Sequence, residues 1–155
     1  MRMLQRTQDL YGKMHRFFIF EDIDGPSPRY DKSTGWGLLT YQGKAKPRYF
    51  AIQFLNEFQG QQLSSEGDGT WVSSLSSKNN QRIQTLIVNY DPNNNHTESV
   101  PINYLNLSPG KYQLKSTPYL GKSSQKTITV STSPHTEIIY LDANTAYLLE
   151  LQMIK

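Results

Sequence analysis

The sequence contains no cysteine among its 155 residues. This absence excludes disulfide bonds, thiolate metal ligands and cysteine nucleophiles, but it does not identify the compartment, because many exported bacterial proteins also lack cysteine. No apolar run approaches the ~20 residues that a helix needs to cross a bilayer, so we expect no membrane partner. Residues 1–6 carry charge without an apolar core and do not match a signal peptide. The localisation is therefore open.

Basic charge is not concentrated in any one stretch. The net charge is +3, and Lys and Arg occur along the chain in ones and twos. A nucleic-acid-binding surface usually clusters its basic residues around aromatic ones, so we expect no nucleic-acid partner. His15, His96 and His135 lie in separate segments without metal-ligand spacing, which predicts no metal site. The chain also has no nucleotide-binding glycine loop and no nucleophile elbow, and we expect no cofactor.

A helix is predicted to begin at Pro47, because a proline in the first turn loses no helical hydrogen bond and its ring presets φ. The apolar residues that follow recur at spacings of three and four, which is typical of one buried face. They are Tyr49, Phe50, Ile52, Phe54, Leu55 and Phe58. Upstream, residues 2–15 have the spacing of an amphipathic helix, and residues 17–22 form an apolar run typical of a strand buried on both faces. Residues 1–60 therefore predict a helix-strand-helix segment.

From Gly60 onward the hydrophobic period changes towards two, and turn residues recur at short intervals. Apolar residues alternate along three of the candidate strands, as in Leu86, Val88 and Tyr90. The seven candidate strands are 70–76, 82–90, 97–105, 112–117, 125–131, 136–141 and 146–153. This pattern predicts a mainly β chain in which residues 61–155 form an immunoglobulin-like antiparallel β-sandwich domain.

The order of these elements resembles the end of a known enzyme fold. The residues that carry this resemblance are Trp36-Gly37-Leu38-Leu39, Gly43-Lys44-Ala45-Lys46-Pro47-Arg48-Tyr49-Phe50-Ala51, Leu55-Asn56 and Leu105-Asn106-Leu107-Ser108-Pro109-Gly110-Lys111-Tyr112. They are similar to the C-terminal part of a retaining, clan A, family 39-like glycoside hydrolase, in which the last unit of a (β/α)8 barrel is followed by a β-sandwich. The resemblance implies that 2–15 is the seventh barrel helix, 17–22 the eighth strand and 46–59 the eighth helix.

The same resemblance implies that the chain is not catalytic by itself. In this clan the acid/base carboxylate stands at the end of the fourth strand and the nucleophile at the end of the seventh. Retaining hydrolysis needs two such carboxyl groups roughly 5–5.5 Å apart. Neither position has a counterpart in this sequence, so we name no catalytic residue.

Carboxylates at the end of the predicted strand are candidates for substrate binding. Glu21 and Asp24 follow the apolar run, and the C-terminal end of a barrel strand opens on the active face. Adjacent strand residues point to opposite faces, so Glu21 and Asp22 do not both address one substrate. The alternative is that these carboxylates cap the loop or pair with Arg29 or Lys32.

Aromatic residues near the loops are the second group of candidates, because an aromatic ring stacks on the apolar face of a sugar. Trp36 and Trp71 are the main candidates for binding a polysaccharide or oligosaccharide, with Tyr30, Tyr41 and Tyr119 nearby. The alternative is that both tryptophans are buried at the boundary between the two parts of the chain.

Together these patterns favour a non-catalytic accessory region of a glycoside hydrolase, whose sandwich supports a barrel. Two alternatives remain open: a carbohydrate-binding β-sandwich module, and an interaction domain that docks on a partner chain. Tyr49, Phe50, Phe54 and Phe58 either cover the sandwich or leave an apolar patch. Such a patch predicts self-association or docking on a barrel domain.

Overall fold

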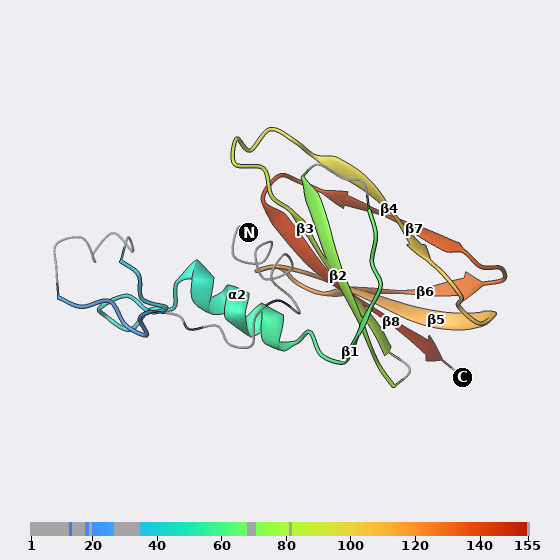
Figure 1. Cartoon of the computed structure of the whole chain (residues 1–155), viewed down its shortest axis with the longest axis horizontal. Helices are drawn as coiled ribbons and strands as arrows, with labels where there is room; N and C mark the ends of the chain where they lie inside the picture. The colour runs from blue at the N-terminus through green and yellow to red at the C-terminus, as the bar shows by residue number, and fades with distance from the viewer. Residues whose placement is uncertain are drawn as a thin grey trace.

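The computed structural model describes residues 13, 18, 20–26, 35–67, 71–80 and 82–154 (Figure 1). The chain is mainly β. One described helix, α2 (Pro47–Asn56), precedes the strands. The strands are β1 (Gln61–Leu63), β2 (Val72–Asn79), β3 (Arg82–Asn89), β4 (Glu98–Tyr104), β5 (Gly110–Pro118), β6 (Ser124–Val130), β7 (His135–Leu141) and β8 (Thr145–Ile154).

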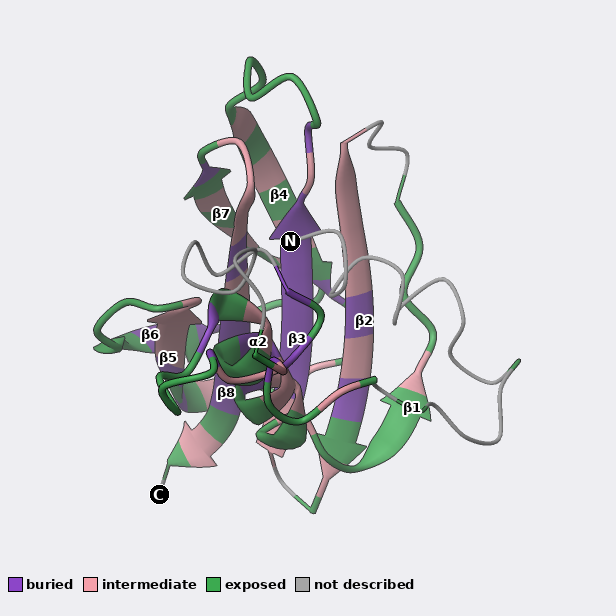
Figure 2. Cartoon of the chain, turned by 90° about the vertical axis from the view of Figure 1, so that its left-hand side faces the viewer, coloured by how far each residue is buried: buried purple, intermediate pink, exposed green. Residues whose placement is uncertain are grey.

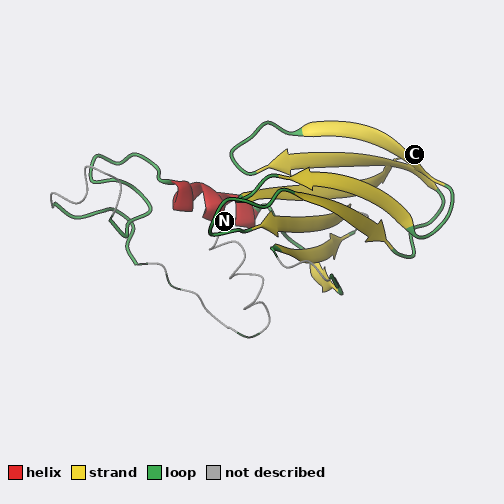
Figure 3. Cartoon of the chain, turned by 90° about the horizontal axis from the view of Figure 1, so that it is seen from above, coloured by secondary structure: helices red, strands yellow, loops and turns green. Residues whose placement is uncertain are grey.

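The strands form two antiparallel sheets that pack as a sandwich. The larger sheet has six strands in the order β1-β2-β3-β8-β5-β6, and the smaller sheet pairs β4 with β7. Helix α2 covers the outer face of β3 and β8, as Figure 2 shows from the helix side, and Figure 3 shows it beside the stacked strands. The layers are therefore a helix, a large sheet and a small sheet.

The central strands are buried on both faces because each face has its own apolar cover. On the helix side Leu86 and Leu148 pair across β3 and β8 and contact Phe54. On the other side Leu149 and Leu151 pack against β5 and the small sheet. Figure 2 shows β3 buried along most of its length. Each fully buried leucine contributes roughly 1.5–3 kcal/mol, so these two strands carry much of the core.

Helix α2 begins at Pro47, as predicted, after an extended Lys46. It ends at Asn56, earlier than the expected 46–59, and the backbone groups of Glu57 and Gln59 hydrogen-bond to side chains of the sheet instead. The side-chain amide of Gln84 donates to the Glu57 carbonyl over 2.9 Å and accepts from the Gln59 amide over 2.9 Å. These contacts tie the end of the helix to β3. The chain then turns into β1 at a Gly60 with φ of +116°.

All seven predicted strands are present, with ends that differ by a few residues. Leu86, Val88 and Tyr90 share the helix-facing side, as alternation predicted. Strand β1 was not expected, because its residues Gln61, Gln62 and Leu63 are mostly polar. The antiparallel sandwich is confirmed. Its six-plus-two division of strands differs from that of immunoglobulin constant domains, and the immunoglobulin-like arrangement stays a prediction.

The buried strand expected over 17–22 does not form in residues 18 and 20–22, the part of it that the structure describes. Phe18 and Phe20 are 84% and 70% exposed, and the nearest β pairing is an isolated parallel bridge between Ile23 and Leu39. A strand buried on both faces needs neighbours on both sides, and one bridging residue supplies neither. The helix expected over 2–15 lies outside the described residues except for Lys13, and the boundary at residue 60 stays a prediction.

Candidate functional site

The candidate carboxylates lie in a loop structure that precedes α2. The backbone amide of Leu38 donates to the Glu21 carbonyl over 2.9 Å, and that of Leu39 donates to the Asp22 carbonyl over 2.9 Å. The Asp24 backbone amide donates to the Leu39 carbonyl over 3.1 Å. These bonds hold residues 21–24 beside residues 37–39. In Figure 1 both stretches lie beyond the N-terminal end of α2, away from the sandwich.

A buried ion pair fixes this loop. The Lys46 Nζ lies 2.5 Å from Asp24 Oδ2, and both side chains are almost fully buried. Asp24 Oδ1 accepts a 2.6 Å hydrogen bond from the Gly37 amide, and Lys46 Nζ also donates to the Gly35 carbonyl over 2.9 Å. Burial acts to raise the pKa of Asp24, but the hydrogen bonds from Lys46 and Gly37 outweigh it and hold this pKa below its ordinary value. Asp24 is therefore a charged group with both oxygens engaged by the protein.

Trp36 is presented by this fixed backbone. It lies between Gly35 and Gly37, and its own carbonyl accepts a 2.5 Å hydrogen bond from Arg48 Nη1. Its side chain is 67% exposed and meets Phe20 edge to face, with ring centroids 6.2 Å apart and planes at 70°. Three consecutive backbone groups are thus held by side chains while the indole stays accessible. The alternative of a buried Trp36 is not what the structure shows.

Gly37 is required by this close packing. A Cβ at this position would lie 2.5 Å from the Asp24 amide nitrogen, closer than real Cβ contacts allow. A larger residue would therefore displace either the ion pair or the Trp36 loop.

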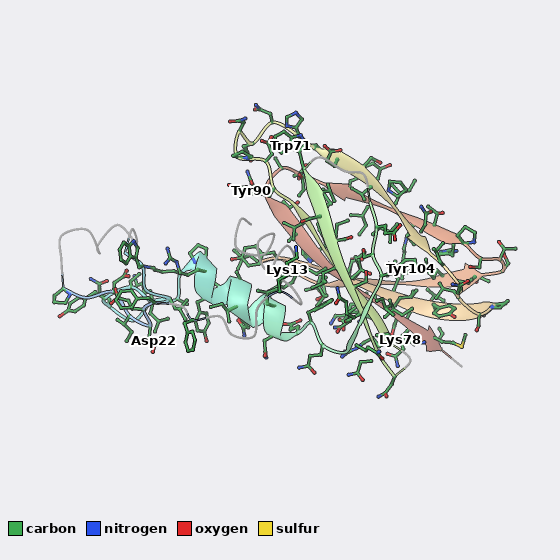
Figure 4. All side chains as sticks on the ribbon, in the orientation of Figure 1. Lys13, Asp22, Trp71, Lys78, Tyr90 and Tyr104 are labelled. Atoms are coloured by element: carbon green, nitrogen blue, oxygen red, sulfur yellow. The ribbon has the colours of Figure 1, made fainter. Side chains whose placement is uncertain are left out.

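Trp71 lies in a different part of the molecule, just before β2. Its ring stacks on His96, with centroids 4.8 Å apart and planes at 19°. Figure 4 places Trp71 and Tyr90 at one end of the sheet and Asp22 in the loop beyond α2. The four candidate site residues therefore divide: Glu21, Asp24 and Trp36 share one loop structure, and Trp71 stands apart.

The loop that carries His96 is organised by Asp91. Its carboxylate is buried and accepts hydrogen bonds from the amides of Asn93, Asn95 and His96, at 2.8, 2.6 and 3.0 Å, and contacts His96 Nδ1 at 2.7 Å. Burial acts to raise the pKa of Asp91, but these hydrogen bonds outweigh burial and lower the pKa to about 2. The Trp71 carbonyl accepts from the Tyr90 amide over 2.9 Å, so Trp71 belongs to the same packed end of the sheet.

Sequence reasoning did not identify the partner of Asp24. Arg29 and Lys32, the partners considered, lie outside the described residues, whereas the observed partner Lys46 is 22 positions away and directly precedes α2. Phe20 was also not named as a candidate. Tyr119 packs on Phe54 and its hydroxyl donates to the Pro47 carbonyl, which is a packing role, while Tyr41 is exposed. The assignment of Glu21, Asp24, Trp36 and Trp71 to sugar binding stays a prediction.

The described residues hold no group of three or more His, Cys, Asp or Glu arranged for a metal ion. Within the same part of the chain, no helix is long and apolar enough to span a membrane.

No protein-family model and no curated protein sequence matches this chain. Solved structures do match. A family 30 endoxylanase from Clostridium papyrosolvens C71 aligns over 97% of this chain and 37% of its own, with a TM-score of 0.62 and 13% identity. The fold is glycoside hydrolase-like. The family 30 subfamily 8 xylanase Xyn30A from Clostridium acetobutylicum aligns over 76% of this chain and 31% of its own, with a TM-score of 0.57 and 11% identity. A glucosidase from Croceicoccus marinus aligns over 77% of this chain and 35% of its own, with a TM-score of 0.53 and 13% identity.

The chain spans about a third of the length of these glycoside hydrolases. At such low identity the matches establish the fold and not the activity.

Proposed function

We propose that this chain is a non-catalytic accessory region of a glycoside hydrolase, in which the β-sandwich packs on a (β/α)8 barrel and stabilises it. The observation that carries the proposal is the match of 97% of this chain to 37% of a family 30 endoxylanase, because it extends beyond the sandwich into the segment before it. The finer assignment rests on two resemblances: residues 36–56 resemble the end of a retaining, clan A barrel, and residues 105–112 resemble a turn of family 39-like enzymes.

The distribution of exposed apolar side chains supports docking on a barrel. Helix α2 buries Ala51 and Phe54 against the sheet, while Tyr49 and Phe50 remain 40% and 36% exposed. Among the described residues between 18 and 50, the exposed large apolar side chains are Phe18, Phe20, Ile23, Trp36, Tyr41, Tyr49 and Phe50. Tyr49 and Phe50 are also in edge-to-face contact, and a contiguous exposed apolar patch is typical of an interaction surface. We refer to Tyr49 and Phe50 as the α2 apolar pair.

A reducing-sugar assay tests the non-catalytic role. The whole chain is incubated with xylan, mannan, cellulose and glycosaminoglycan fragments, and we expect no product above the level of a heat-denatured sample. Hydrolysis that rises with chain concentration and disappears in Glu21→Gln would contradict this role.

A carbohydrate-binding module is the second candidate function. It is favoured by the exposed Trp36, because three side-chain hydrogen bonds hold the backbone of residues 35–37. Docking on a separate partner chain is the third candidate. It would use the same α2 apolar pair, Tyr49 and Phe50, as docking on a barrel.

A further inference from the structure

We propose that the outer edge of β6 pairs with the same edge of a second copy of this chain, antiparallel and about a two-fold axis. The pairing joins two six-stranded sheets into one continuous sheet. Figure 2 shows β6 and β1 at opposite edges of the large sheet, with α2 over the strands between them. The inference is independent of docking on a barrel, because α2 packs on β3 and β8 and not on β6.

The outer edge of β6 offers free backbone groups. β6 ends the strand order of the large sheet, and β5 is its one partner among the described strands. The pairing with β5 runs from Ser124 to Val130 in continuous register without a bulge. In an antiparallel strand alternate residues direct both N–H and C=O to the same side, so every second residue of β6 faces outward. Such a row of donors and acceptors is a template for another strand.

The other edges of the described sheets carry protection against such pairing. β1 is only three residues long. β4 has Pro101 in its middle, and a proline has no N–H to donate to a further strand. β7 carries Glu137, whose side chain is only 11% exposed, and a charge directed inward disfavours a new edge partner. β6 has seven residues, five of them exposed, and contains neither proline nor glycine.

The charge of Lys126 does not protect β6 in the usual way. A lysine on an edge strand normally repels a second strand, and Lys126 is the one charged residue of β6. Its Nζ lies 2.5 Å from Glu137 Oε2 within the same chain. The edge is therefore close to neutral, which favours a neutral strand over a charged peptide as its partner.

A second copy is the occupant because β6 is complementary to itself. Full overlap of two copies of this strand puts its middle residue, Thr127, on the two-fold axis. Lys126 then lies opposite Ile128 of the second copy. Gln125 lies opposite Thr129 of the second copy. No like charges lie directly opposite each other, and a threonine pair is a favourable cross-strand contact. A two-fold axis also closes the assembly at two chains.

The symmetry determines where α2 lies in the dimer. A two-fold axis that relates antiparallel edge strands of one sheet stands perpendicular to that sheet. Helix α2 therefore lies on the same face of the joined sheet in both copies, and the α2 apolar pair stays accessible in each. Pairing through β6 is thus compatible with docking of each copy on its own barrel.

Sedimentation equilibrium tests the pairing on the whole chain. The background carries Tyr49→Ser and Phe50→Ser, which removes association through the α2 apolar pair. An edge interface is small, so we expect a dimer with a dissociation constant between about 10 μM and about 1 mM. Thr127→Glu and Thr127→Lys should each weaken this dimer at least about tenfold, because like charges then meet at the axis. An equimolar mixture of the two variants should restore it, because opposite charges face each other.

The matched control makes the same two substitutions at Thr97, an exposed residue of the loop between β3 and β4. Thr97→Glu and Thr97→Lys should dimerise like the background, alone or mixed. Hydrogen exchange provides a test without a substitution in β6. Exchange of alternate β6 amides should slow as the chain concentration rises, while exchange of the β1 amides stays constant.

The pairing is overturned by a background that stays monomeric, by Thr127 variants that dimerise like the background, or by a mixture that does not recover. A monomeric background combined with a parent chain that associates would overturn the β6 pairing and leave docking through α2 standing. A background that dimerises as fully as the parent, with slowed exchange in β6, would support the β6 pairing and remove the evidence for docking through α2.

Discussion

Lys46 reaches back 22 positions to Asp24, and the two side chains form a buried ion pair with Nζ 2.5 Å from Oδ2. Lys46 is also the residue before the Pro47 that starts α2, so the pair joins the loop carrying Trp36 to the helix that packs on the sandwich. Breaking one partner of a buried pair leaves an unpaired charge, which costs more than the pair contributes as a whole. The pair therefore makes the geometry of the loop dependent on the helix.

Gly37→Ala should disturb the Trp36 loop without unfolding the sandwich. The added Cβ would lie 2.5 Å from the Asp24 amide nitrogen, so the loop must shift, at a cost of about 1–3 kcal/mol. Trp36 fluorescence in a Trp71→Phe background and chemical denaturation measure the two effects. Gly67→Ala is the matched control, because a Cβ there meets nothing within 4 Å. Equal behaviour of the two variants would show that the close approach at Gly37 is not required.

Phe54→Ala should destabilise the fold strongly. Phe54 is buried between α2 and the central strands, and removing a buried phenylalanine side chain typically costs about 3–5 kcal/mol. Urea denaturation measures this as a fall in the transition midpoint. Tyr49→Ala lies on the exposed side of the same helix and should change stability by less than about 1 kcal/mol. A small effect of Phe54→Ala would mean that α2 does not depend on the sheet.

Gln84→Ala should loosen the end of α2. The Gln84 side-chain amide hydrogen-bonds to the Glu57 carbonyl, the Gln59 amide and Glu150. Its loss leaves the Glu57 carbonyl and the Gln59 amide without this partner, at a cost of about 1–3 kcal/mol, while Glu150 keeps Arg82 and Lys115. Hydrogen exchange should show faster exchange of the Gln59 amide. The exposed Gln113→Ala, which loses only a surface contact to Gln125, should stay within about 0.5 kcal/mol of the parent. An unchanged Gln59 exchange rate would contradict the role of Gln84.

Asp91 should give the fold a defined acid sensitivity. Its pKa is about 2 in the folded chain against an ordinary 3.8, so the folded state binds the proton more weakly than the unfolded state. The stability that the carboxylate contributes is therefore complete above the ordinary pKa and is lost as the pH falls through the folded pKa. Melting temperatures from about pH 5 to about pH 2 should fall less steeply in Asp91→Asn than in the parent. Identical slopes would exclude Asp91 as the titrating group.

The sandwich could be predicted from the sequence because strand and turn signals are local. Alternation placed Leu86, Val88 and Tyr90 on one side, and turn residues such as Asp91 marked the strand ends. Alternation alone did not show that this side faces a helix and the opposite side a second sheet. Strand β1 carried no apolar signal, and it forms because Gln61–Leu63 pairs with β2 in register.

The candidate site could be predicted only in part, because its contacts are distant in sequence. The exposed Trp36 and the neighbouring Glu21 were recognisable as residue types that bind sugars. The Asp24–Lys46 pair and the Phe20–Trp36 contact join positions 22 and 16 residues apart, and no spacing rule marks either pair. The apolar run at 17–22 was misleading, because an apolar segment has the same sequence pattern whether its side chains are buried in a strand or exposed, as Phe18 and Phe20 are.

Sedimentation velocity tests the docking surface, and with it the accessory role, most directly. We expect the chain to self-associate with rising concentration through its apolar segment, and the double substitution Tyr49→Ser and Phe50→Ser to reduce this association. The control replaces Ile138 and Tyr140, two exposed residues of β7, with serine and should associate like the parent. Association that is lost only in the control, or a chain that stays monomeric in every form, would contradict docking through the segment before the sandwich.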